Sequence, residues 1–447
     1  MVFKDKNVMV VGMAKSGFSA AKLLVQEGAN VLLYDRRDSE QVDLGELADS
    51  CTDCLGKDPM EIMEQSDILV LSPGVPTRLD FIKKAHELKK PVISEIELGY
   101  LFSKADFVCI SGTNGKTTTT ALTGEIFKNA GRKTYVLGNI GRPITEDALK
   151  TKPGDTVVAE VAALQLETID TFRPRAAALL NVTEDHMDRF LTMDYYTHCK
   201  MRMFENQTAD DFAVLNLDNE ITAKMGEGLK GKVLSFSRVQ KVENGAYVNK
   251  GELLFVRDGE EEFVCNKDDI VIPGAHNLEN ALAATCLAMS MGIDARTVEY
   301  TLKTFAGVEH RIEFVKTVDG ISYINDSKGT NPDATIKAIE AMTKPTVLIL
   351  GGFDKHSEFD DMFAHFTDNI KGIVLLGATR DKINEAAEKA GFANKLFADT
   401  FEEAVMKAKG MAERGYNVLL SPACASWDMF DNFEQRGEVF KEIVNSL

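Results

Sequence analysis

Residues 106–120 combine the residue types that bind phosphate groups. Their letters, DFVCISGTNGKTTTT, indicate an apolar strand over 106–110, a glycine-rich turn, and a helix that opens at Lys116 and ends near Gly131. Backbone N–H groups in such a turn, together with the helix N-terminus, form an anion site. Lys116 would reach the β- and γ-phosphates of a nucleotide, and the Thr117 hydroxyl would ligate Mg²⁺. Ile110 stands where the full motif has its first glycine, so GTNGKT is a shortened variant, and a plain strand–turn–helix is the alternative.

Two later segments end apolar strands with side chains that bind metal ions. Glu160 follows the predicted strand 156–159, and His186 follows a strand that ends near Asn181. The carboxyl ends of neighbouring parallel strands face the crevice in which ligands bind. Each residue alone would be an ordinary surface carboxylate or loop histidine, but their shared placement after the phosphate loop favours a metal site.

The N-terminal segment VMVVGMAKSGFSAAKLLVQEGANVLLYDRR resembles a dinucleotide-binding turn. It indicates a strand over 8–11, a helix to about Glu27 and a strand over 31–34. Asp35 then stands at the end of the second strand, where an acidic residue bonds a ribose. Ala14 occupies the middle glycine position, so we predict a Rossmann-like domain adapted to another ligand. A purely structural βαβ unit is the alternative.

Three segments in the last third of the chain each follow a predicted strand. They are DSKGTN from Asp326, GGFDK ending at Lys355, and SPACASWDMFDNFEQRG from Ser421. Their lysines and hydroxyls would collect at one edge of a sheet, which suits a small carboxylate substrate.

The composition limits the classes of partner. A chain of 447 residues exceeds what one hydrophobic core ordinarily serves, so we expect several domains. The balance of 51 Lys+Arg against 69 Asp+Glu gives a net charge of −18, which argues against a nucleic-acid or anionic membrane surface. The sequence shows neither a secretory signal nor an apolar run of about 18 residues. With seven scattered cysteines, these features predict a cytoplasmic protein.

The chain alternates apolar β-branched runs with amphipathic segments of helical length, which is typical of parallel sheets covered by helices. We predict an α/β protein of three domains, over 1–103, 104–307 and 308–447. Between 231 and 263 the pattern changes to short strand-like pieces, which indicate an insertion or a sheet edge.

Motifs from all three predicted domains together resemble the Mur ligase family. They are the N-terminal unit, SPGVP at 72–76, GNIG at 138–141, NVTEDHMDRF, GAHNLENALAA, the pair His310-Arg311, NDSKGTN, and SPACAS with FDNFEQRG. The GTNGKT loop alone is shared with folylpolyglutamate synthetases, but the combination is similar to the D-glutamate-adding branch. The resemblance implies a Rossmann-like N-terminal domain that binds a UDP substrate, a central P-loop ATPase domain, and a Rossmann-like C-terminal domain that binds the amino acid.

The resemblance also implies roles residue by residue. Contacts to the UDP substrate would come from Lys15, Ser16, Asp35, Arg36, Arg37, Ser72, Asn139 and Gln165. ATP would be bound by Gly112, Thr113, Asn114, Gly115, Lys116, Thr117, Thr118, Asn277, Asn280, Arg311, Asp326 and the catalytic Lys328. Magnesium would be held by Thr117, Glu160 and His186, and D-glutamate by Thr330, Lys355, Ser426 and the backbone of Phe433.

The implied reaction is ATP-dependent amide-bond formation through an acyl phosphate, which joins D-glutamate to UDP-N-acetylmuramoyl-L-alanine in peptidoglycan precursor synthesis. It implies ATP, two Mg²⁺ ions and small-molecule substrates, and no obligate protein partner. Lys200 matches a lysine that the family carries as a carbamate and that assists metal binding; its spacing alone instead favours a solvated lysine on an amphipathic helix, with Tyr196, Met203 and Phe204 facing the core.

Two departures from the family pattern are Ala162-Ala163, where a serine pair is expected, and Gly329, where an alanine is expected. The first departure puts one hydrogen bond to substrate or metal-bound water in doubt. Outside this class, the first βαβ unit leaves open a nicotinamide-dependent oxidoreductase, and the phosphate loop leaves open a non-catalytic nucleotide switch.

Overall fold

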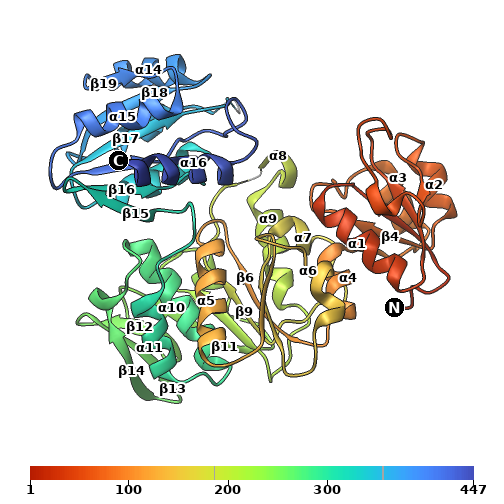
Figure 1. Cartoon of the computed structure of the whole chain (residues 1–447). Helices are drawn as coiled ribbons and strands as arrows, with labels where there is room; N and C mark the ends of the chain where they lie inside the picture. The colour runs from red at the N-terminus through yellow and green to blue at the C-terminus, as the bar shows by residue number, and fades with distance from the viewer. Residues whose placement is uncertain (186, 355–356) are drawn as a thin grey trace. The chain divides into compact units, whose positions relative to one another are not determined.

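The computed structural model describes residues 1–185, 187–354 and 357–447, which form an α/β protein with three sheets (Figure 1). This confirms the predicted fold class. Two compact units divide the chain. One unit comprises residues 1–270 and 276–304 and contains the first two sheets, and the other comprises 271–275 and 305–447 and contains the third sheet.

The first sheet is parallel, with the strand order β3-β2-β1-β4-β5. It is buried on both faces, because Val8 and Val10 of β1 pack in one hydrophobic cluster while Met9 and Val11 pack in another. Its strands are β1 (Asn7–Val11), β2 (Asn30–Tyr34), β3 (Thr52–Asp53), β4 (Ile68–Leu71) and β5 (Val92–Ser94). Its helices are α1 (Lys15–Gln26), α2 (Pro59–Gln65), α3 (Asp80–Glu87) and α4 (Glu95–Phe102).

The second sheet has the order β14-β13-β12-β11-β10-β9-β6-β8-β7. It is parallel from β7 to β12 and antiparallel beyond, so the strand-like pieces predicted over 231–263 form its edge. Its strands are β6 (Asp106–Ser111), β7 (Thr134–Gly138), β8 (Thr156–Glu160), β9 (Ala176–Leu179), β10 (Phe212–Asn216), β11 (Lys232–Ser237), β12 (Gly245–Asn249), β13 (Glu252–Arg257) and β14 (Glu260–Asn266).

The helices of this region are α5 (Lys116–Asn129), α6 (Ile144–Asp147), α7 (Ala163–Leu166), α8 (Met187–Phe190), α9 (Met193–Met201), α10 (Ala275–Ser290) and α11 (Ala295–Thr304). Helix α6 contacts both α1 and α4. The Thr145 hydroxyl of α6 donates to the Ser19 hydroxyl of α1 over 2.7 Å. These contacts join the first two sheets into one unit.

The third sheet has the order β15-β16-β20-β17-β18-β19 and is parallel except for β15. Leu348 and Leu350 of β17 pack on one face, and Val347 and Ile349 pack on the other. Its strands are β15 (Glu313–Val318), β16 (Ile321–Asn325), β17 (Thr346–Gly351), β18 (Ile370–Leu376), β19 (Lys395–Phe397) and β20 (Asn417–Leu420). Its helices are α12 (Pro332–Glu340), α13 (Asp360–Ala364), α14 (Arg380–Lys389), α15 (Phe401–Met411) and α16 (Phe433–Ser446).

The strands predicted over 8–11, 31–34, 106–110 and 156–159 match β1, β2, β6 and β8 to within one residue at either end. The predicted domain boundaries at 103/104 and 307/308 stay predictions. Among the described residues, no helix is long and apolar enough to cross a membrane.

Candidate active site

The phosphate loop, residues 112–117, connects β6 to α5 as predicted. Gly112 and Gly115 both adopt positive φ values, of 157° and 84°. A Cβ on Gly115 would lie 2.4 Å from Oδ1 of Asn280 on α10, so glycine is required for the close approach as well as for the backbone conformation. The side chains of Thr117 and Thr118 are buried in the first turn of α5, where the helix presents N–H groups without intrahelical partners.

Asn277 and Asn280, two predicted ATP contacts, pack behind this loop on α10. The Asn280 amide donates to Oδ1 of Asn277 over 3.0 Å, and its own oxygen accepts from the Thr119 hydroxyl over 3.1 Å. Both asparagines are buried. The structure therefore brings them to the phosphate loop, where Asn280 supports the turn at Gly115.

Two lysine ammonium groups converge on the carbonyl oxygen of Gly112. Lys116 Nζ donates to this oxygen over 2.9 Å and to the carbonyl of Thr113 over 2.8 Å. Lys200 Nζ donates to the same Gly112 oxygen over 2.8 Å. The amino groups of both lysines therefore lie at the loop that is predicted to bind phosphate.

Lys200 lies on α9 and is only 1% exposed, so the solvated lysine favoured by spacing alone is wrong. Tyr196, Met203 and Phe204 are buried as predicted. The Lys200 ammonium lies 4.5 Å from the ring centroid of Tyr196, and no carboxylate among the described residues forms an ion pair with it. Burial and the charge of Lys116 hold the pKa of Lys200 well below its ordinary value.

Asn181, which we did not predict as functional, shapes the phosphate loop. Its side-chain oxygen accepts from the backbone N–H groups of Thr113 and Asn114, over 3.0 and 2.8 Å. The Thr113 hydroxyl also contacts the Tyr196 hydroxyl over 3.3 Å. Asn181 opens the motif NVTEDHMDRF, so a polar residue straight after a buried strand was the available signal.

Glu160 ends β8 as a buried acceptor. Its Oε1 accepts from the Asn139 amide over 2.8 Å, whereas its Oε2 is buried without a hydrogen-bond partner among the described residues. A buried carboxylate oxygen without a donor is costly unless a ligand satisfies it. This orphan oxygen fits the predicted magnesium ligand.

The predicted partner of Glu160, His186, lies outside the described residues. The expectation that their strands are neighbours is wrong in one respect, because β6 lies between β8 and β9. Both strands still flank the strand that leads into the phosphate loop. The carboxyl ends of β8 and β9 therefore lie on either side of the strand that leads into that loop.

Gln165, a predicted substrate contact, is held by a second buried carboxylate. Its amide donates to Oε1 of Glu95 over 2.8 Å, and its oxygen accepts from the N–H of Ala162 over 2.8 Å. Glu95 is 2% exposed at the start of α4. Burial raises the pKa of Glu95 to about 7. The sequence shows a glutamate after an apolar strand, but nothing in it marks this burial.

The predicted uridine-binding residues lie after β1 and β2. The Asp35 carboxylate accepts from the N–H of Met13 over 2.9 Å and from the guanidinium of Arg37 over 3.0 Å, and hydrogen bonding to Arg37 holds the pKa of Asp35 far below its ordinary value. The Ser72 hydroxyl donates to Gly12 O over 2.7 Å, which places it at the same turn. Lys15 is exposed and donates to the Gly141 carbonyl over 2.6 Å. Ser16 lies beside it on α1, and Arg36 is exposed.

In the C-terminal unit, the three loops predicted to gather at one sheet edge follow adjacent strands. Strand β20 pairs with β16 on one side and β17 on the other. The loop after β16 (residues 326–331) and the loop after β20 (residues 421–426) are joined by the Ser421 hydroxyl, which donates to Asp326 over 2.6 Å. Burial raises the pKa of Asp326 to about 7. Thr330 is half-buried and Ser426 is buried, but Lys355 lies outside the described residues.

Lys328, Arg311 and Phe433 lie on segments that meet this edge. The ammonium of Lys328 lies 5.5 Å from the ring centroid of Phe433, the first residue of α16. The backbone N–H of Lys328 donates to the His310 carbonyl over 3.0 Å. Arg311 follows His310 in the segment before β15, and its charge acts on Asp326.

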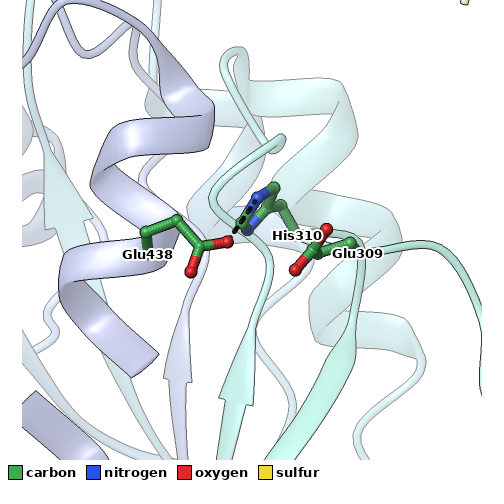
Figure 2. A group of neighbouring side chains, drawn as sticks. All are labelled: Glu309, His310 and Glu438. Carbon is green, nitrogen blue, oxygen red and sulfur yellow. Dashed lines mark ion pairs between the residues drawn. The ribbon is translucent and has the colours of Figure 1, made fainter. Parts of the chain in front are cut away.

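His310 forms part of a polar cluster with Glu309 and Glu438 of α16 (Figure 2). Its Nε2 lies 3.5 Å from Glu438. Three ligand-type groups this close could hold a cation, but Lys441 forms ion pairs with Glu309, Glu313 and Glu438. The cluster is therefore a network of ion pairs that fastens α16 to the segment before β15.

Three family models match consecutive parts of the chain. The Mur ligase MurD-like N-terminal domain matches residues 6–94, the Mur ligase middle domain matches 110–288, and the Mur ligase glutamate ligase domain matches 310–424. The UDP-N-acetylmuramoylalanine–D-glutamate ligase of Thermoanaerobacter pseudethanolicus is 48% identical over 452 residues, and the match covers all of both chains. The chain belongs to the Mur ligase family.

Other Mur ligases support this assignment. The ligase of the same printed name from Caldanaerobacter subterraneus subsp. tengcongensis is 47% identical over 454 residues and is also matched over its whole length. The crystal structure of UDP-N-acetylmuramate-alanine ligase from Thermotoga maritima shares the fold, with a TM-score of 0.61 at 18% identity and 99% coverage of each chain. Membership of the Mur ligases removes the support for a nicotinamide-dependent oxidoreductase.

One departure from the Mur ligase pattern has a structural explanation. A Cβ on Gly329 would lie 2.6 Å from Oδ2 of Asp326 and 2.7 Å from the Ser421 hydroxyl. Glycine therefore allows the hydrogen bond between Asp326 and Ser421 to close beneath the loop. At the other departure, Ala162 precedes α7 and donates its N–H to Gln165.

Proposed function

We propose that this chain is an ATP-dependent ligase that joins D-glutamate to UDP-N-acetylmuramoyl-L-alanine. The observation that carries the proposal is full-length identity of 47–48% to curated ligases of that name. The phosphate loop with two converging lysines supports the ATP-dependent step. In this role the enzyme serves peptidoglycan synthesis in the cytoplasm, and its seven free cysteines are consistent with a reducing compartment.

The reaction has two steps. A carboxylate oxygen of UDP-N-acetylmuramoyl-L-alanine attacks the γ-phosphorus of ATP, the bond to the β–γ bridging oxygen breaks, and ADP leaves. The amine of D-glutamate then attacks the acyl carbon, phosphate leaves with the bonding electron pair, and the amine loses a proton. The protein does little covalent work here, so positioning and charge neutralisation dominate.

Lys116 is the residue that neutralises charge on the transferred γ-phosphoryl group. In the structure its ammonium lies against two carbonyl oxygens of the phosphate loop, and a phosphate in the loop offers it a stronger, charged acceptor. Asn277, Asn280, Arg311, Asp326 and Lys328 complete the proposed ATP contacts, with Thr113, Asn114, Thr117 and Thr118 in the loop and its first helical turn.

The residues present fit a bound Mg²⁺. Glu160 offers a buried, unpartnered carboxylate oxygen, and Thr117 offers a hydroxyl at the start of α5. His186 is the further proposed ligand. When bound, the metal would neutralise phosphate charge and polarise the reacting oxygens.

Lys200 is proposed to carry a carbamate. Its buried amine, with no carboxylate partner among the described residues, is held where a bare ammonium would repel the metal. The neutral amine nitrogen bonds to the carbon of CO₂ and releases a proton, which leaves a group with one negative charge and two acceptor oxygens. The modified side chain then acts as a carboxylate at the metal site.

The remaining substrate contacts are assigned to two places. The UDP part is bound by Asp35, Arg36, Arg37, Lys15, Ser16 and Ser72. The muramoyl-alanine part is bound by Asn139 and Gln165. Thr330, Lys355, Ser426 and the backbone of Phe433 grip the two carboxylates of D-glutamate. The loops that carry Thr330 and Ser426 follow the adjacent strands β16 and β20, which supports this grouping.

Release of phosphate from ATP tests the function directly. The purified chain is incubated with UDP-N-acetylmuramoyl-L-alanine and either D- or L-glutamate. Turnover that depends on D-glutamate and on the UDP substrate is the expected result. Equal rates with the two enantiomers would refute the assignment of the amino acid, and binding of ATP without turnover would indicate a nucleotide switch instead.

A further inference from the structure

Arg436, in the first turn of α16, is a buried cation on which Asp326 and Asp428 act only from beyond ion-pair distance. Its side chain is 1% exposed and is among the largest fully buried side chains that the structure describes. No carboxylate among the described residues forms an ion pair with it. Burial lowers the pKa of its guanidinium to about 10, so it remains charged at neutral pH. Burying an unpaired charge is costly, which makes this position unusual.

All five N–H donors of this guanidinium are satisfied by neutral oxygen atoms of two loops. Nε donates to the Ser327 hydroxyl over 2.9 Å, and one terminal nitrogen donates to the Ser327 carbonyl over 2.7 Å. The remaining donors contact the carbonyls of Cys424 and Ala425 over 3.1 to 3.3 Å. Arg436 therefore binds the loop after β16 and the loop after β20 at the same time.

The Ser327 hydroxyl extends the connection to α16 itself. Because Nε can only donate, the hydroxyl accepts from Arg436 and gives its own proton to the carbonyl of Phe433, over 2.7 Å. A third loop also approaches closely. A Cβ on Gly352, just after β17, would lie 3.3 Å from a terminal nitrogen of Arg436.

The segments that Arg436 holds are those proposed to grip D-glutamate. Ser426 follows Ala425 directly, Thr330 lies three residues after Ser327, and Phe433 itself receives the Ser327 hydroxyl. Glu438 and Lys441 fasten the next turns of α16 to the segment before β15 through His310 and Glu309. Helix α16 lies along the third sheet beside β15 and β16 (Figure 1).

We propose that Arg436 is a positioning residue for D-glutamate, which sets the spacing of the loops that grip the two carboxylates and supplies a buried positive charge behind them. The inference rests on the proposed D-glutamate site. A dianionic amino acid is favoured by a fixed cation behind its site, and among the described residues no carboxylate forms an ion pair with Arg436 that would hold this charge elsewhere. Lysine cannot replace the guanidinium, since its three donors radiate from one atom and cannot span both loops.

Steady-state kinetics of full-length Arg436→Lys test the proposal. The KM for D-glutamate should rise about tenfold or more, because the charge stays but the loop spacing is lost. The KM values for ATP and the UDP substrate should stay within about twofold. Lys441→Met is the matched control, since Lys441 is a cation of the same helix but contacts neither of the two loops. It should lower thermal stability and leave the KM for D-glutamate unchanged.

A second variant keeps the test decisive if Arg436→Lys folds poorly. Ser327→Ala retains the guanidinium but cuts its connection to Phe433, so the same selective rise in KM is expected, at about threefold or more. An equal loss for all three substrates, or no change in either variant, would overturn the proposal. Ser426→Ala distinguishes failure of the proposed D-glutamate site from failure of the role of Arg436. If this variant also leaves the KM for D-glutamate unchanged, the proposed D-glutamate site is wrong. If the KM for D-glutamate rises selectively in this variant alone, only the role of Arg436 is wrong.

Discussion

The ammonium group of Lys116 donates to two carbonyl oxygens of the phosphate loop, which places its charge at the proposed site of the nucleotide phosphates. Lys116→Ala should lower kcat by about 10²-fold or more, because the γ-phosphoryl transition state loses its main cation. Phosphate release measures this effect. Lys128→Ala, in an exposed pair with Glu125 on the same helix, should behave as wild type; equal activity of both variants would contradict the phosphate-loop assignment.

Lys200 provides a stricter test, because its proposed function depends on the carbamate and not on the charge of lysine. Lys200→Arg should lose about 10²-fold or more in kcat despite keeping a cation. Lys200→Ala should recover part of its activity when formate or acetate fills the vacated volume. The exposed Lys224→Arg is the matched control. Wild-type activity of Lys200→Arg, or an unmodified lysine mass in active protein prepared without carbon dioxide, would exclude the carbamate.

Glu95 makes stability depend on pH. Its pKa is raised to about 7 from 4.5, so between these values the folded chain holds a proton that the unfolded chain has released. The free energy of unfolding therefore falls as pH rises through this window, by at most about 3 kcal/mol. Glu95→Gln removes this contribution, and its Tm relative to wild type should rise by about 3–6 °C between pH 5 and pH 8.

The comparison between Glu95→Gln and wild type at each pH is necessary because Asp326 titrates in the same range. Its contribution is common to both proteins and cancels in the difference. Glu87→Gln, at an exposed residue of α3, should show a Tm difference that does not vary with pH. A Tm difference for Glu95→Gln that is likewise constant would show that the buried carboxyl does not titrate.

At the scale of elements, the two ends of α5 offer a matched pair of glycines. Gly115 and Gly131 both have positive φ, but only a Cβ on Gly115 meets another atom, Oδ1 of Asn280 at 2.4 Å. Gly131→Ala should cost about 1 kcal/mol of stability with unchanged KM values. Gly115→Ala should also raise the KM for ATP about tenfold or more, because the turn must move away from α10. Equal KM values for ATP in the two variants would contradict the requirement for glycine at position 115.

The strands and the phosphate loop could be predicted because their signals are local. Apolar runs set β6 and β17, and Gly-Lys-Thr at the start of α5 identifies the anion site. The order of the strands is not local. Sequence places Glu160 and residues 181–186 after successive strands, but only the fold inserts β6 between those strands. For the same reason, contacts over long separations, such as Gln165 with Glu95, were not predicted.

Burial of charged side chains was the other feature that sequence could not supply. Lys200 and Arg436 stand in segments with ordinary amphipathic spacing, in which a cation is usually solvated. They contact segments far along the chain, which are the phosphate loop for Lys200 and the loops after β16 and β20 for Arg436. Arg436 lies behind the proposed D-glutamate site and Lys200 lies at the proposed metal site, so the desolvation cost of each side chain has a functional explanation.

At the scale of the whole molecule, the chain is built from two units with separate hydrophobic cores. The third sheet packs its two faces in clusters drawn from residues 312–447 alone. The proposed contacts for UDP, the phosphate loop and the metal lie in the N-terminal unit, and those for D-glutamate lie in the C-terminal unit. Chains of this kind commonly unfold in more than one step.

We therefore expect two transitions in differential scanning calorimetry of the full chain without ligands. Lys441→Met should shift only the transition of the C-terminal unit, because it breaks the ion pairs of Lys441 with Glu309 and Glu313, which fasten α16 to the rest of that unit. Glu95→Gln should shift only the other transition, since Glu95 and its partner Gln165 both lie in the N-terminal unit. A single transition that moves in both variants would show that the two units unfold cooperatively, contrary to this prediction.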